Sequence, residues 1–163
     1  MIPVAIAAYA CAIISANLLV LRFGPPVIPL VAFFLIGLDL ALRNWLNLRM
    51  RPLAMGILIL ATGVVTYLVN PAARSIAIAS AVAFTAAALA DWATFRAVSG
   101  SWIRRNVAGA TVGAAVDSIL FPTLAFGALL PALVVAQFVA KVAGAALWGW
   151  LIRPREAQAR AAG

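Results

Sequence analysis

Long apolar stretches alternate with short polar or basic segments along the whole chain. Six of these stretches approach the roughly 20 residues that a helix needs to cross a bilayer. Pro25-Pro26 and Asn70-Pro71 are turn signals between neighbouring stretches. The first stretch stays apolar for too long to be a cleaved signal peptide and has no basic segment before it, so we expect it to be retained. We predict six membrane-spanning helices, at residues 3–21, 27–42, 53–69, 76–95, 106–127 and 132–152.

The composition indicates a membrane protein. Hydrophobic residues make up 66% of the chain and charged residues 10%, whereas soluble domains have about 25% charged residues. We predict an all-α integral membrane protein with a compact six-helix transmembrane domain over residues 1–152 and a polar cytoplasmic tail over 153–163. The chain has no histidine and one cysteine, Cys11, which excludes histidine-based catalysis, the usual zinc sites and an internal disulfide. We expect no cofactor, no metal and no enzymatic activity.

The arginines are distributed unequally between the two ends of the predicted helices. Nine follow the second, fourth and sixth spans, and two lie on the other side. Short loops rich in Arg stay in the cytoplasm, so we predict a multi-pass protein of the cell membrane with both termini cytoplasmic. The net charge of +8 then reflects topology and lipid headgroups, and no nucleic-acid partner is expected. The basic loop at 43–52 is predicted to lie in the headgroup layer, and 96–105 is predicted to be a second basic loop on the same side. An interfacial belt of Trp45, Trp92, Trp102, Trp148 and Trp150 is predicted near this face.

One carboxylate, Asp117, lies deep inside the fifth span. It follows Gly109 and Gly113 at four-residue spacing, and Phe121 continues the same stripe. The two glycines allow another helix to approach this face closely. A carboxylate that faces lipid costs several kcal/mol, so Asp117 must face protein or a water-filled cavity. Pro122 is expected to bend or end the helix just beyond it.

The only lysine of the chain, Lys141, is predicted to lie level with Asp117. At about 1.5 Å per residue, both come roughly 15 Å into the membrane, near its midplane. Gln137 lies one turn outward on the lysine's face, and Asn17 of the first span lies further out. We predict that these four side chains line one cavity that opens outward. The alternatives are a purely structural ion pair and amides that only hold helices together.

Two further acidic residues lie nearer the ends of their spans. Asp39 precedes Arg43 by four residues, so a helix-end ion pair is favoured over a role in ligand binding. Asp91 precedes Arg96 by five residues and lies about 7 Å inside the membrane. For Asp91, pairing with Arg96 and ligand binding both stay open.

Several motifs resemble those of the queuosine-precursor transporters within the vitamin uptake transporter group. The most specific is ADWATF at 90–95, followed by a helix of small residues with an Asp-Ser pair at 117–118. The segments ANLLV at 16–20 and 29–44 add to the resemblance, which covers nearly the whole chain. Ala114 and Ala115 stand where many members carry Asn or Gln, and Arg43 where many carry Glu.

The resemblance implies a bundle of six helices similar to the substrate-binding components of energy-coupling-factor transporters, with a site reached from outside. It also implies import of a small, flat, nitrogen-rich molecule, 7-cyano-7-deazaguanine or a related deazapurine. The predicted substrate-binding residues are Asp117, Ser118, Lys141, Gln137, Asn17, Phe121, Asp91 and Asp39.

In this hypothesis the carboxylate of Asp117 accepts two N–H groups from a guanine-like edge. Gln137 and Asn17 complete polar recognition, Phe121 stacks on the ring, and Lys141 offsets the charge of Asp117 or donates to a carbonyl of the ligand. Two other classes stay open: a vitamin-binding subunit that needs an ATPase partner, and a structural membrane protein without a substrate. A homodimer stays open as well.

Overall fold

The computed structural model describes residues 2–69 and 74–154. Every regular element within these ranges is helical. The predicted turn at Asn70-Pro71 and residues 155–163 of the predicted tail lie outside the described residues.

The helices follow the predicted order, with one irregular element in the second span. That span consists of the short 3-10 helix η1, the single turn α2, the π-helix η2 and the regular helix α3. The bounds are α1 Ile2–Phe23, η1 Pro25–Val27, α2 Ile28–Val31, η2 Ala32–Ile36, α3 Gly37–Asn47, α4 Pro52–Val69, α5 Arg74–Ala97, α6 Trp102–Phe126 and α7 Pro131–Leu151.

Five of the helical stretches in the described residues are long and apolar enough to cross a membrane. They are Ile2–Val20, Ile28–Asn47, Ile78–Ala97, Trp102–Ala125 and Pro131–Leu151. The apolar stretch of α4, Pro52–Val65, is shorter than these five. The chain is therefore an all-helical, multi-pass membrane protein.

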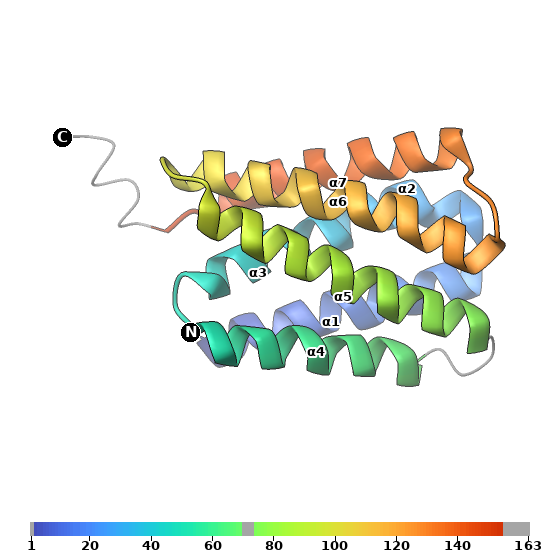
Figure 1. Cartoon of the computed structure of the whole chain (residues 1–163), viewed down its shortest axis with the longest axis horizontal. Helices are drawn as coiled ribbons and strands as arrows, with labels where there is room; N and C mark the ends of the chain where they lie inside the picture. Colours follow the sequence, from blue (N-terminus) through green and yellow to red (C-terminus); the bar gives the residue numbers. More distant parts are fainter. Residues whose placement is uncertain (1, 70–73, 155–163) are drawn as a thin grey trace.

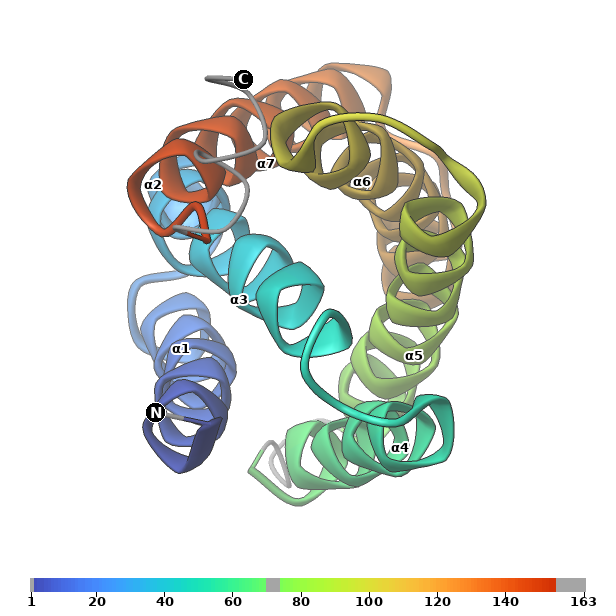
Figure 2. The same cartoon turned by 90° about the vertical axis from the view of Figure 1, so that its left-hand side faces the viewer.

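The helices run side by side along the long axis of the molecule, and α1 begins at the same end at which α7 finishes (Figure 1). Viewed from that end, α3 lies inside an arc formed by α1, α7, α6, α5 and α4 (Figure 2). Of the five, the span that contains α3 is the most buried, because 56% of its most apolar part lies inside the bundle. Polar residues of α3 are thereby carried to the centre of the bundle.

The predicted basic loop at 43–52 is wrong in its first half. The helix continues to Asn47, and Trp45 and Leu46 are buried. Both belong to an apolar cluster with Tyr9, Met55 and Phe95, so they pack inside the bundle rather than in the headgroup layer. The hydrophobic effect favours this burial over the interface.

The second basic segment is also shorter than predicted. The helix α6 begins at Trp102, where the side chain of Ser101 caps it by accepting a hydrogen bond from the backbone N–H of Arg104. Trp102 is buried, and its Nε1 donates to the carbonyl of Gly149 at 2.8 Å. Trp45 and Trp102 therefore do not belong to an exposed interfacial belt, whereas Trp150 is exposed.

Pro122 does not end its helix. α6 continues to Phe126, and the chain then turns at Gly127, which has a left-handed φ of +67° at the helix C-terminus.

The predicted close approach at Gly109 and Gly113 is confirmed, and the partner is α5. A Cβ atom added to Gly109 would overlap the carboxylate of Asp91, and one added to Gly113 would lie 2.9 Å from the Cβ atom of Asp91. These glycines therefore bring the backbone of α6 against the acidic residue of α5.

A second close crossing joins the irregular span to α7. A Cβ atom added to Gly37 would lie 2.7 Å from Cα of Gly144, and one added to Gly144 would overlap the carbonyl oxygen of Phe33. A π-helix disturbs the regular bonding of backbone carbonyls. Within η2 the carbonyl of Phe34 accepts a hydrogen bond from Nε1 of Trp148 on α7 at 2.9 Å.

Replacing Gly144 by alanine tests this crossing. We expect Gly144→Ala to destabilise the protein by about 1–3 kcal/mol, because the added methyl group meets backbone atoms that cannot move independently. Thermal unfolding of the detergent-purified protein measures the change. The matched control is Gly56→Ala on α4, where nothing lies within 4 Å and the better helix propensity of alanine favours folding. Equal stabilities of the two variants would contradict the tight crossing.

Candidate functional site

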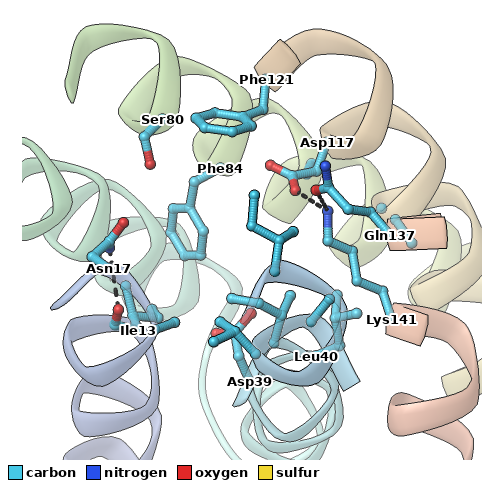
Figure 3. Close-up of a pocket in the computed structure, with 18 of the residues that line it drawn as sticks. Ile13, Asn17, Asp39, Leu40, Ser80, Phe84, Asp117, Phe121, Gln137 and Lys141 are labelled. Carbon is cyan, nitrogen blue, oxygen red and sulfur yellow. Dashed lines mark hydrogen bonds and ion pairs between the residues drawn. The ribbon is translucent and has the colours of Figure 1, made fainter. Parts of the chain in front are cut away.

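A cavity of about 120 Å³ lies between α1, the irregular second span, α5, α6 and α7. One water needs about 10–15 Å³ of such space, so the cavity is large enough for several waters or a small organic molecule. Figure 3 shows Asn17, Ser80 and Phe121 around one part of it and Asp39 and Leu40 around the other. The first three residues come from the halves of α1, α5 and α6 that lie at the end opposite the start of α1 (Figure 1). The cavity therefore extends from the centre of the bundle toward that end.

Lys141 holds a polar cluster on one wall of the cavity. Its Nζ donates to Asp117 Oδ2 at 2.5 Å, to Gln137 Oε1 at 3.1 Å and to Ser118 Oγ at 3.2 Å. These bonds use the three donors of the ammonium group. The predicted pairing of Asp117 with Lys141 is thus confirmed, as is the position of Gln137 on the lysine's face.

The same cluster places an unused hydrogen-bond donor of Gln137 beside an acceptor, the carboxylate of Asp117. Because an ammonium group only donates, the amide oxygen of Gln137 must face Lys141, which leaves Nε2 directed elsewhere. Nε2 is buried and has no hydrogen-bond partner among the described residues. The side chain of Asp117 is 24% exposed, whereas that of Lys141 is 3% exposed. A molecule in the cavity can therefore reach the carboxylate while the lysine stays covered.

A second polar network is centred on Arg43 and lies deeper in the bundle. Its Nε donates to Asp91 Oδ2 at 2.9 Å, and its Nη2 forms an ion pair with the same oxygen at 2.8 Å. The other carboxylate oxygen, Oδ1, accepts from Asn44 Nδ2 at 3.0 Å, and this same amide group reaches Asn106 Oδ1 at 3.3 Å. Asn106 in turn donates to the carbonyl of Ala145 at 2.9 Å. The network joins α3, α5, α6 and α7.

This network decides between the two alternatives for Asp91 and corrects the predicted position of Asp39, whose ion pair with Arg43 is present. Asp91 pairs with Arg43 of α3, whereas its predicted neighbour Arg96 is exposed at the end of α5. Asp39 is not at a helix end near the interface, because α3 places it in the buried centre. Its Oδ2 lies 3.9 Å from Arg43 Nη2, which satisfies an ion pair but is too long for a hydrogen bond.

The predicted site residues divide into two groups. Asn17, Asp39, Asp117, Phe121, Gln137 and Lys141 line the cavity. Ser118 and Asp91 are buried behind it, where Ser118 holds Lys141 and Asp91 holds Arg43. The amide of Asn17 donates to the carbonyl of Ile13 at 3.1 Å.

Arg43, Ser80 and Phe84 also line the cavity and were not predicted as site residues. Four-residue spacing is the signal that identifies them, because Arg43 follows Asp39 and Phe84 follows Ser80 on one helix face. The spacing of Asp39 and Arg43 was interpreted as an ion pair at a helix end, so Arg43 was not counted among the residues that line the cavity.

Comparison of the sequence with known protein families identifies one match. Residues 4–153 match the sequence model of the family described as "Putative vitamin uptake transporter". The chain belongs to this family. Searches of the curated proteins and of the solved structures returned no significant match. Membership in the vitamin uptake transporter family confirms the predicted group, and it agrees with charged side chains that line a cavity inside a membrane protein.

The contact between Asp117 and Lys141 generates a double-mutant test. Asp117→Asn or Lys141→Met alone leaves one buried charge without its partner, so each is expected to destabilise the protein by about 3–5 kcal/mol. The double variant should lose much less than the sum, because both charges are removed together. Thermal unfolding in detergent measures all four proteins. Additive losses would contradict a direct interaction.

Proposed function

We propose that this vitamin uptake transporter imports a small, flat, nitrogen-rich molecule through the cavity, with a queuosine precursor such as 7-cyano-7-deazaguanine as the first candidate. In this proposal the chain crosses the cytoplasmic membrane six times and has both termini in the cytoplasm. The substrate enters from outside and binds between α1, α3, α5, α6 and α7.

Two features support the proposed topology. The 18 residues of α4 span about 27 Å as a helix, close to the roughly 30 Å of the hydrocarbon core. Arginine also remains concentrated at one end of the bundle after Arg43 is removed from the loops. The end at which α1 begins carries Arg49, Arg51, Arg96, Arg104, Arg105 and Arg153, against Arg22 and Arg74 at the other.

The substrate proposal is supported most directly by one feature of the cavity wall, where the amide donor of Gln137 lies beside the acceptor carboxylate of Asp117. Asp117 and Gln137 both contact Lys141 Nζ, so the carboxylate and the free amide Nε2 belong to one cluster. A guanine-like edge carries N–H donors next to a carbonyl acceptor. The N–H groups suit Asp117, and the carbonyl suits Nε2 of Gln137.

The rest of the cavity suits an aromatic ring. Phe84 and Phe121 line it together with aliphatic residues that include Ile13 and Leu40 (Figure 3). Ligand sites are usually of this kind, mostly apolar with a few polar groups that fix orientation. Phe121 is the residue proposed to stack on the ligand.

Uptake by the variant Asp117→Asn tests this assignment. The substitution keeps the size of the side chain but replaces one acceptor oxygen with a donor, which opposes an N–H group of the ligand. We expect a loss of uptake of at least about 100-fold, since a mismatched buried hydrogen bond costs several kcal/mol. The measurement is uptake of labelled 7-cyano-7-deazaguanine, or restoration of queuosine in tRNA, in cells that cannot make the precursor.

The matched control is Thr123→Val on the same helix, because Thr123 is exposed on the outside and its hydroxyl bonds only to the carbonyl of Ile119. This variant should transport at the parental rate. Parental uptake by Asp117→Asn protein made in normal amounts would show that Asp117 does not recognise the substrate.

A further inference from the structure

The buried charges around the cavity do not balance. Three of the four acidic residues of the chain, Asp39, Asp91 and Asp117, lie in or directly behind the cavity wall. The basic side chains that face the cavity, among the residues the structure describes, are Arg43 and Lys141. With all five groups ionised, the site has one negative charge in excess.

Hydrogen bonds show which carboxylate is left over. Arg43 donates to Asp91 at 2.9 Å and forms an ion pair with it at 2.8 Å, and Lys141 donates to Asp117 at 2.5 Å. Asp39 is only 2% exposed, and its nearest cation, Arg43, lies 3.9 Å away and is bonded to Asp91. Its other oxygen, Oδ1, has no hydrogen-bond partner among the described residues.

The neighbouring helices do not supply the missing positive charge. Toward α3, α5 brings Asp91, α6 brings Asp117, and α7 brings Lys141, which is already shared by three acceptors. From α1 comes Tyr9, a buried hydroxyl group 3.3 Å from Thr62 Oγ1 of α4. An isolated carboxylate in a low-dielectric interior is strongly unfavourable unless a counter-charge reaches it. The cavity is the open route to Asp39, because Asp39 lines it.

We propose that Asp39 is a specificity residue that binds a positively charged nitrogen group of the substrate, so that the transporter prefers substrates with one positive charge over neutral analogues. The ring of such a substrate lies against Asp117 and Gln137, and its ammonium group supplies the counter-charge at Asp39. This inference rests on the proposed import function, and within the queuosine precursors it ranks the charged 7-aminomethyl-7-deazaguanine above the neutral 7-cyano compound.

Matched pairs of compounds test the preference for charge. In each pair one polar substituent is exchanged for an aminomethyl group: 7-cyano- against 7-aminomethyl-7-deazaguanine, and pyridoxine against pyridoxamine. Binding is measured as ligand-induced thermal stabilisation and by calorimetry on the purified full-length protein. The aminomethyl member of at least one pair should bind at least about tenfold more tightly than its neutral partner. In Asp39→Asn protein this preference should disappear or reverse.

The stability of the ligand-free protein provides a second measurement. Asp39→Asn removes a carboxylate that lies 3.9 Å from Arg43, too far for a hydrogen bond, so the unfolding temperature should rise or stay the same. Asp91→Asn is the matched control, because it removes the partner of Arg43 and should lower the unfolding temperature by several degrees. This comparison also shows whether the Asn variants fold.

The proposal is supported if the parent protein prefers the charged compounds, if Asp39→Asn abolishes this preference, and if Asp91→Asn but not Asp39→Asn lowers the unfolding temperature. Equal binding of charged and neutral partners, or a preference that survives Asp39→Asn, would overturn it while leaving the import function intact. Equal destabilisation by Asp39→Asn and Asp91→Asn would overturn the charge count. If none of the four compounds is bound or taken up, both proposals are overturned.

Discussion

A buried arginine in a membrane protein must be neutralised inside the protein, and the contact of Arg43 with Asp91 meets this requirement at the centre of the bundle. The rest of the architecture is consistent with this one interaction. α3 lies inside the arc of the other helices, and Gly109 of α6 leaves room for the carboxylate of Asp91 on α5. Asn44 and Asn106 extend the network to α6 and α7. Four helices are thereby fixed in register behind the cavity.

In the proposed binding site, the two polar networks would have both a structural role and a role in binding. Asp91 and Ser118 lie behind the wall and position Arg43 and Lys141, whereas Asp39, Asp117 and Gln137 present groups to the cavity. A binding site gains specificity when its polar groups are held in place before the ligand arrives, because less conformational freedom is lost on binding. The structural bonds to Lys141 and Arg43 provide this preorganisation.

The sequence was sufficient to predict the helical fold, the Asp117–Lys141 pair and the contact with Gln137, because hydrophobic length and helical periodicity determine these features. Predictions failed where a long-range partner decides the outcome. Arg43 and Trp45 were predicted to belong to a basic interfacial segment. Instead Arg43 pairs with Asp91 inside the bundle, and Trp45 packs in an apolar cluster. Pro122 was expected to bend or end its helix, and α6 continues past it to Phe126, as the predicted span of 106–127 requires. The predicted ion pair of Asp39 with Arg43 is present at 3.9 Å, but Arg43 also bonds to an acid 48 residues farther on, which the spacing did not predict. Local spacing carries no information about such competition.

Cysteine labelling in cells tests the central claim most directly, namely that the cavity opens to the outside and holds the substrate. In a Cys11→Ala background, Ser80→Cys places a thiol in the cavity wall, and Val82→Cys places one on the exposed outer face of the same helix. A membrane-impermeant maleimide added outside should label the cysteine at 80 and not the one at 82, which faces lipid. The presence of 7-cyano-7-deazaguanine or its aminomethyl analogue should slow the labelling at 80. Reaction at 80 only after the membrane is opened, or labelling that neither compound slows, would contradict the account.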